Sequence, residues 1–274
     1  MPELITPQGN YSVSAILFDK DGTLVQFLSL WGSWSECFLG EFTRQLEQRG
    51  LKFPVQILAS LLGTVHNAEG KITDYDRNGP LAMGTMGDLY AILSWQAYLL
   101  GLSWAESLEL VDACRQEADA MLERSRPALP LPGLLRFLDD CTAQGLALAV
   151  VTADDTAAAE NHLRWLGIRE YFSAVIGTDQ VERGKPFADM ALLACERLEL
   201  HPSGVAVIGD TNGDMRMARA AGARVAVGIT GVSGTEADGG IAGTAGTLAA
   251  CNLLPDADSL VQSFAELSLG RNAP

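Results

Sequence analysis

Short apolar runs without polar alternation occur at five places along the chain. They are SAILFD at 14–19, LALAVV at 146–151, and three shorter runs at 174–176, 205–208 and 225–227. A continuous apolar run of this length, bounded by turn residues, is typical of a strand buried on both faces of a parallel sheet. Each run therefore predicts one strand of such a sheet.

Apolar residues recur with helical spacing between the later runs. Leu134, Leu138 and Cys141 fall on one face of a helix that Gly145 is expected to end. Further helices are expected at Ala159–Leu166, from Pro186 to Leu198, and at Asn212–Ala221. Pro186 suits the first helical position, and the spacing places Phe187 on the apolar face of that helix. Alternating strands and helices predict an α/β fold with a doubly wound parallel sheet.

Residues 26–126 interrupt this alternation, because they contain no convincing strand. Helix-like stretches occur instead at Trp34–Arg49, Val55–Leu62, Met86–Leu100 and Trp104–Arg124. The sequence thus predicts an α/β core, formed by residues 1–25 and 127–274, with a helical module at 26–126 inserted after the first core strand. Trp31 and Trp34 are spaced i, i+3, and we expect them to pack inside that module rather than line a pocket.

The tail departs from both patterns. Residues 228–246 are rich in Gly, Ser, Thr and Ala and predict a loop, with room for one short helix. Residues 258–267 predict a last small strand and helix.

The net charge and the cysteines limit the partners and the cellular compartment that we expect for this protein. The 274 residues carry 34 acidic and 19 basic side chains, a formal net charge of −15. Such a charge argues against a nucleic-acid or anionic membrane surface as partner. The five cysteines are scattered without a CxxC pair, which favours free thiols in a reducing compartment. We find neither a signal peptide nor a membrane-length apolar run, so a cytoplasmic protein is expected.

Polar residues follow three of the buried runs. The first ends in Asp19-Lys20-Asp21, the second in Thr152-Ala153-Asp154, and the fourth in Gly209-Asp210, with Asp214 shortly after. Ligands bind outside the carboxyl ends of the strands in open α/β sheets. These side chains are therefore expected to converge on one crevice, together with Lys185 of Gly184-Lys185-Pro186.

Several carboxylates without His or Cys make a hard oxygen site, for which Mg²⁺ is the natural ion. A carboxylate beside the metal can attack phosphorus, and a second one can protonate the leaving oxygen and later deprotonate water. Asp19 and Asp21 are two residues apart, so an extended chain would point both to one side and Lys20 away. Taken singly, each residue has an ordinary structural explanation as a turn, a cap or a surface charge. Their joint occurrence at strand ends favours phosphate chemistry.

Four segments of the chain together resemble the four motifs of haloacid dehalogenase-like hydrolases. They are ILFDKDGTL at 16–24, VVT ending at Thr152, GKP with Lys185, and GDTNGD at 209–214. Within that superfamily the chain is similar to the phosphoglycolate-phosphatase-like group. The resemblance implies that Asp19 is the nucleophile and a Mg²⁺ ligand. It implies that Asp21 is the general acid/base and binds the metal through its carbonyl. Thr152, Ala153 and Lys185 would bind phosphate, and Asp210 and Asp214 would bind or support the metal.

The resemblance also implies that the inserted module is a C1-type cap, which closes over the site and selects the substrate. An Asp at the position of Asp21 points to phosphatases or phosphomutases rather than dehalogenases, phosphonatases or ion pumps. Val25-Gln26-Phe27 and a long cap depart from the group on the substrate side. We therefore expect a Mg²⁺-dependent hydrolase of a small phosphomonoester, phosphoglycolate-like or a sugar phosphate, as a monomer or homodimer.

Two alternatives remain open at this point. One is a sugar phosphomutase of the same superfamily, and the other is a non-catalytic module that binds a phosphate ligand. The isolated histidines His66, His162 and His201 receive no role.

Overall fold

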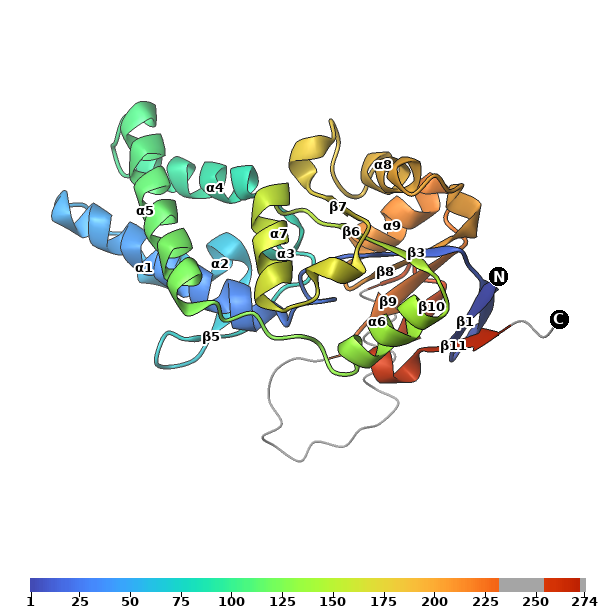
Figure 1. Ribbon diagram of the computed structural model, residues 1–274. Coiled ribbons are helices and arrows are strands. Elements are labelled where there is room, and N and C mark those ends of the chain that lie inside the picture. The colour runs from blue at the N-terminus through green and yellow to red at the C-terminus, as the bar shows by residue number, and fades with distance from the viewer. Residues whose placement is uncertain (232–253, 272–274) are drawn as a thin grey trace. The chain divides into compact units, whose positions relative to one another are not determined.

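The computed structural model describes residues 1–231 and 254–271, and the chain divides into two units (Figure 1). The first unit is Met1–Gln26 with Ala128–Pro274, and the second is Phe27–Pro127. The boundaries expected from the sequence fall one residue before these. None of the described helices is long and apolar enough to cross a membrane.

The first unit contains a six-stranded parallel sheet with the strand order β10-β9-β8-β3-β6-β7. Its strands are β3 (Ala15–Phe18), β6 (Ala147–Val151), β7 (Ala174–Ile176), β8 (Val205–Gly209), β9 (Val225–Ile229) and β10 (Ser259–Val261). The predicted doubly wound α/β fold is confirmed, and each of the five apolar runs forms one strand. β3 lies between β6 and β8, so its carboxyl end has the ends of both neighbouring strands beside it.

Helices cover both faces of this sheet. They are α6 (Leu134–Ala143), α7 (Thr156–Trp165), α8 (Asp189–Arg197) and α9 (Asn212–Ala221). Leu17 belongs to the cluster that includes Met190 of α8 and Met215 of α9. Its neighbour Phe18 faces the other way, against Phe137 of α6. Successive side chains of a strand point to opposite faces of the sheet, so Leu17 and Phe18 pack against different helices. β3 is therefore buried on both faces.

The helix predicted to open at Pro186 begins at Asp189 instead, so that prediction was wrong. The Phe187 amide donates to the Gly184 carbonyl at 3.1 Å, and this turn occupies the residues before the helix. Phe187 is 48% exposed, with the Arg183 guanidinium 4.9 Å above its ring, rather than on the buried face. Lys185 is therefore in a loop, and the Lys185–Pro186 peptide bond is cis.

The structure also contains elements that the sequence did not predict. A three-stranded antiparallel sheet joins β1 (Pro2–Thr6) to β2 (Gly9–Ser12) and β11 (Ser268–Arg271). The helix expected before residue 267 is only the 3₁₀ turn η6 (Phe264–Glu266). Other 3₁₀ turns are η3 (Arg169–Tyr171), η4 (Thr178–Gln180) and η5 (Pro202–Gly204). Most of the predicted 228–246 loop lies outside the described residues.

The second unit is mainly helical. Its helical elements are η1 (Leu28–Gly32, a π-helix), α1 (Ser33–Gln48), η2 (Val55–Ile57, a 3₁₀ turn), α2 (Leu58–Leu62), α3 (Pro80–Met83), α4 (Met86–Leu99) and α5 (Trp104–Ser125). As expected, Trp34 is fully buried in the unit, with Trp31 against it, and its indole N–H donates to Asp119 at 2.8 Å.

The expectation that this unit has no strand was wrong. β4 (Thr64–His66) and β5 (Ile72–Tyr75) form an antiparallel hairpin. Asn67 stabilises its turn, because the Asn67 side-chain oxygen accepts from the amides of Glu69 and Lys71. The strands are too short to give an alternating pattern that stands out from the surrounding turn residues.

The cysteines agree with the expected free thiols wherever the structure describes them. Cys114, Cys141 and Cys195 are buried and Cys37 is partly buried, and none of these four is in a disulfide. Cys251 lies outside the described residues.

Candidate active site

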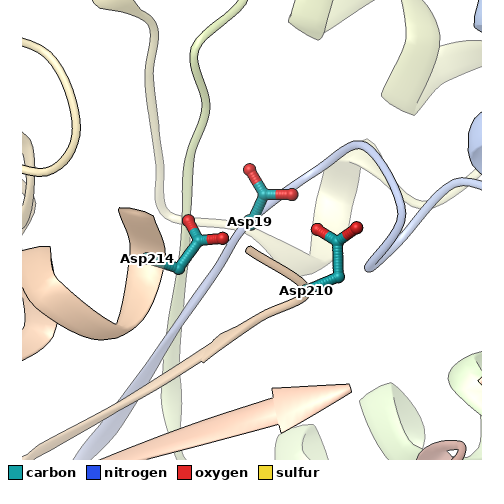
Figure 2. A group of neighbouring side chains, drawn as sticks. All are labelled: Asp19, Asp210 and Asp214. Atoms are coloured by element: carbon teal, nitrogen blue, oxygen red, sulfur yellow. The ribbon is translucent and has the colours of Figure 1, made fainter. Parts of the chain in front are cut away.

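Asp19 is the first residue after β3 and is one of three neighbouring buried carboxylates (Figure 2). Its amide donates to the Ile208 carbonyl at 2.8 Å, which fixes the end of β3 against β8. The residue is only 6% exposed. Asp210 follows β8 directly, so the parallel pairing of the two strands places these carboxylates side by side.

Asp214 joins this pair through the start of α9. Thr211 is the N-cap of that helix, and Asp214 completes a capping box with it. One carboxylate oxygen, Oδ2, accepts from the Thr211 amide at 3.1 Å and from its hydroxyl at 2.6 Å. The cap thereby fixes the rotamer of Asp214. One ligand oxygen from each of Asp19, Asp210 and Asp214 lies within 4.8 Å of the other two.

Glycines allow the backbone to approach these acids closely. Gly22 has φ +84°, and a Cβ added there would lie 2.0 Å from Oδ2 of Asp210. At Gly209 an added Cβ would lie 2.5 Å from the Cβ of Asp214. A side chain at either position would collide with a carboxylate of the cluster.

Lys185 contributes a positive charge to the cluster. Its ammonium lies 2.5 Å from Oδ1 of Asp19 and 2.6 Å from Oδ1 of Asp214. Burial alone would lower the pKa of Lys185, but the charges of Asp19 and Asp214 overcome burial and raise it above its ordinary value. Lys185 is therefore charged at neutral pH.

The three carboxylates outnumber the Lys185 ammonium. Burial raises the pKa of Asp19 to about 7; Lys185 opposes this shift, and the charges of Asp214 and Asp21 add to it. Three buried carboxylates close together need more positive charge than one lysine provides. Their hard oxygen donors fit Mg²⁺, and Asp19, Asp210 and Asp214 are the side chains that would hold it.

Thr152 and Ala153 follow β6, the other neighbour of β3, as the sequence predicts. Thr152 is buried, its amide donates to the Ile176 carbonyl, and its hydroxyl accepts from the Asp154 amide at 3.1 Å. Ala153 is partly exposed. Residues at the ends of β3, β6 and β8 thus lie at one edge of the sheet.

Asp21 is placed differently from Asp19. Residues 20–25 turn back on themselves, with the Leu24 and Val25 amides both donating to the Lys20 carbonyl. The Lys20 ammonium consequently donates to Oδ1 of Asp21 at 2.8 Å. The expectation that an extended chain would point Lys20 away from Asp21 was wrong, and the Asp21 carboxylate lies outside the cluster of Asp19, Asp210 and Asp214.

A second buried cluster surrounds Lys20, and the sequence did not reveal it. The Lys20 ammonium also lies 3.1 Å from Oδ2 of Asp154 and 3.0 Å from Nδ1 of His162. His162 was given no role, yet it is 4% exposed. The available signal was its position on the face of α7 that carries Ala159, since a polar residue on a buried face requires a partner.

Comparison with known proteins now places the chain in a family. Residues 13–222, most of the chain, match the model of the haloacid dehalogenase-like hydrolases. The chain belongs to this family. The resemblance seen in the sequence is therefore confirmed, and Asp19, Thr152, Lys185 and Asp210 all lie within the matched residues.

Two curated relatives show similarity over part of the chain. A probable phosphatase, IndB of Dickeya dadantii, is 39% identical over 104 residues, which are 38% of this chain and 45% of that protein. A phosphoglycolate phosphatase of Escherichia coli is 41% identical over 99 residues, 36% of this chain and 39% of that protein. The matched segments thus span less than half of the length of these relatives.

Solved structures share the fold. A predicted phosphoglycolate phosphatase from Haemophilus somnus aligns with a TM-score of 0.58 at 20% identity, covering 80% of this chain and 86% of that one. A β-phosphoglucomutase from Clostridium difficile aligns with the same TM-score at 17% identity, covering 92% and 91%. At these identities the likeness concerns the fold alone.

Proposed function

We propose that this protein is a Mg²⁺-dependent phosphatase that hydrolyses a small phosphomonoester through an aspartyl phosphate on Asp19. The observation that carries the proposal is the buried group of Asp19, Asp210 and Asp214 around Lys185. Membership of a hydrolase family and similarity to phosphatases support it. The preferred substrates are phosphoglycolate-like or sugar phosphates.

Each side chain has a part in the proposed reaction. Asp19 attacks phosphorus, and the alkoxide of the ester leaves with a proton from Asp21. Water then attacks the phosphorus of the aspartyl phosphate while Asp21 takes up its proton, which releases inorganic phosphate and regenerates Asp19. Lys185 and the segment at Thr152 and Ala153 hold the phosphoryl oxygens.

Mg²⁺ held by Asp19, Asp210 and Asp214 would offset negative charge on the phosphoryl group and the acids. The Asp21 carbonyl is the further ligand that the family resemblance implies. Without the ion, the cluster carries more negative than positive charge and repels a phosphate ester. Lys185 is already engaged by Asp19 and Asp214, so it cannot reverse the local charge alone.

The second unit is proposed to act as a cap that selects the substrate, in a protein that works in the cytoplasm as a monomer or homodimer. A cap fits a phosphatase because the aspartyl phosphate has to form before bulk water reaches the site.

The Asp19→Asn variant tests the proposed nucleophile. It keeps the size of the side chain and removes the attacking carboxylate, so Mg²⁺-dependent release of phosphate from an aryl phosphate should fall to the background level. Asp140→Asn is the matched control, because Asp140 is an exposed acid on α6 that lies 3.9 Å from Arg136. It should retain wild-type activity. Full activity in a folded Asp19→Asn variant would overturn the proposal.

The same preparation separates the two alternatives. Hydrolysis in ¹⁸O-labelled water places the label in the released phosphate, whereas a mutase returns the phosphoryl group to a bound sugar phosphate without it. A non-catalytic module binds the ester and releases no phosphate in the presence of Mg²⁺.

A further inference from the structure

Lys20 is a fully buried lysine next to the proposed nucleophile, and its ammonium contacts a different cluster of side chains. Its ammonium lies 2.8 Å from Asp21, 3.1 Å from Asp154 and 3.0 Å from Nδ1 of His162. Oδ2 of Asp154 is in turn 3.5 Å from Nδ1 of His162. A buried ammonium requires such partners, because an uncompensated charge in the interior is very costly.

The cluster connects three segments that are distant in the sequence. Lys20 and Asp21 follow β3, Asp154 follows Thr152 at the end of β6, and His162 lies on α7. The Trp165 ring packs beside the imidazole, with ring centroids 4.9 Å apart. His162 is fixed on α7, and Asp21 and Asp154 lie in the short segments that follow β3 and β6, so these three side chains restrict the movement of the ammonium.

The protonation states agree with this geometry. Burial and the Lys20 charge together lower the pKa of His162, so the imidazole is neutral at pH 7. A neutral Nδ1 without a proton can accept from the Lys20 ammonium. Burial alone would raise the pKa of Asp154, but the charge of Lys20 overcomes burial, and the pKa is lowered to about 2. Lys20 and Asp154 therefore form a buried ion pair, and Lys20 also donates to a neutral imidazole.

We propose that Lys20, held by Asp154 and His162, is a positioning residue that fixes the Asp21 carboxylate for proton transfer to the leaving group. This inference rests on the proposed phosphatase function and on Asp21 as its general acid. Lys20 engages one oxygen of Asp21, Oδ1, and so restricts rotation of the carboxylate. The other oxygen is then the one that exchanges a proton with substrate. Proton transfer depends steeply on such alignment.

A pair of substrates with different leaving groups distinguishes this role from a purely structural one. An alkyl phosphate needs its leaving oxygen protonated, whereas 2,4-dinitrophenyl phosphate releases a stable anion without an acid. The quantity to measure is kcat/KM, because it covers the steps up to formation of the aspartyl phosphate and excludes its hydrolysis. The ratio of kcat/KM for the two substrates then reports the function of the acid.

Lys20→Met keeps the length of the side chain and removes its charge. We expect kcat/KM for the alkyl phosphate to fall about 10²-fold, and for the dinitrophenyl ester to fall less than about threefold. Asp154→Asn should lower kcat/KM by a smaller factor, again more for the alkyl phosphate than for the dinitrophenyl ester. The double variant Lys20→Met/Asp21→Asn should lose no more kcat/KM for the alkyl phosphate than Asp21→Asn alone, since Lys20 acts through Asp21.

Folding controls accompany these variants, because Lys20→Met leaves the Asp154 carboxylate buried beside a neutral side chain. The double variant Lys20→Met/Asp154→Asn removes both charges together and serves if the single variant does not fold. Arg169→Met is the matched control. It breaks the 2.6 Å ion pair of Arg169 with Glu160 on α7, the helix that carries His162, without touching Lys20. Its leaving-group ratio should equal that of the wild type.

Three outcomes would overturn the inference. Equal losses for both substrates in a folded Lys20→Met variant would show a structural role only, while the phosphatase proposal stands. Additive losses in the Lys20→Met/Asp21→Asn double variant would show that Lys20 does not act through Asp21. A wild-type protein that hydrolyses neither ester would remove the phosphatase proposal and this inference with it.

Discussion

The Gly22→Ala substitution tests how the metal site is built, because Gly22 lies against Asp210 and has φ +84°. An alanine in this left-handed backbone conformation destabilises the fold by about 1–2 kcal/mol. Its Cβ would also lie 2.0 Å from Oδ2 and 2.5 Å from Cγ of Asp210, well inside van der Waals contact. Asp210 is 3% exposed and cannot move away into solvent, so the carboxylate has to shift within the cluster.

Gly145→Ala provides the matched control. Gly145 has φ +70° in the same unit, and nothing lies within 4 Å of an added Cβ. The control therefore carries the backbone strain without the collision. It should lower Tm by about 2–4 °C for each kcal/mol lost, and leave Mg²⁺ binding unchanged.

Isothermal titration of Mg²⁺ into the two variants and the wild type separates the two effects. Gly22→Ala should weaken Mg²⁺ binding by at least about tenfold and lower Tm further than Gly145→Ala does. The reasoning is refuted if Gly22→Ala binds Mg²⁺ as tightly as the wild type and unfolds together with Gly145→Ala.

The other predictions concern charge. The pKa of Asp154, about 2 against an ordinary 3.8, means that below about pH 4 the unfolded chain binds a proton that the folded protein does not. The ionised Asp154 carboxylate contributes about 2 kcal/mol to the free energy of unfolding. This contribution is fully present above about pH 4 and is lost as the pH falls toward 2. Urea unfolding between about pH 5 and 3 should show a shallower decline for Asp154→Asn than for the wild type, and equal slopes would contradict this. Inorganic phosphate should bind in Mg²⁺ and lose measurable affinity in chelator, and tight binding in chelator would refute the charge balance proposed for the cluster.

The sequence predicted the sheet because its strands are buried on both faces, and burial on both faces leaves long apolar runs. It predicted the positions of Asp19, Thr152 and Asp210 for a related reason: a residue that directly follows a strand stays at the edge of the sheet. The capping box of Asp214 also has a local sequence signature, Thr211 followed three residues later by an acid.

The missed features depend on contacts between distant segments or on very short elements. Lys20 and His162 are 142 positions apart in the sequence, and they meet only because β3 and α7 belong to the same unit. The β4–β5 hairpin is too short to show an alternating pattern. Pro186 suits a helix start by its own geometry, but the turn at Gly184 delays the helix to Asp189.

The central claim is that Asp19 receives the phosphoryl group. It is tested most directly by acid-quenching the protein during turnover of a phosphate ester in Mg²⁺ and mapping the modified peptide by mass spectrometry. We expect a phosphoryl group on Asp19 that hydroxylamine removes, as it does from acyl phosphates, and none on the Asp19→Asn variant. Turnover by the wild type with the phosphoryl group on another residue, or hydrolysis that proceeds at the wild-type rate in Asp19→Asn, would contradict the account.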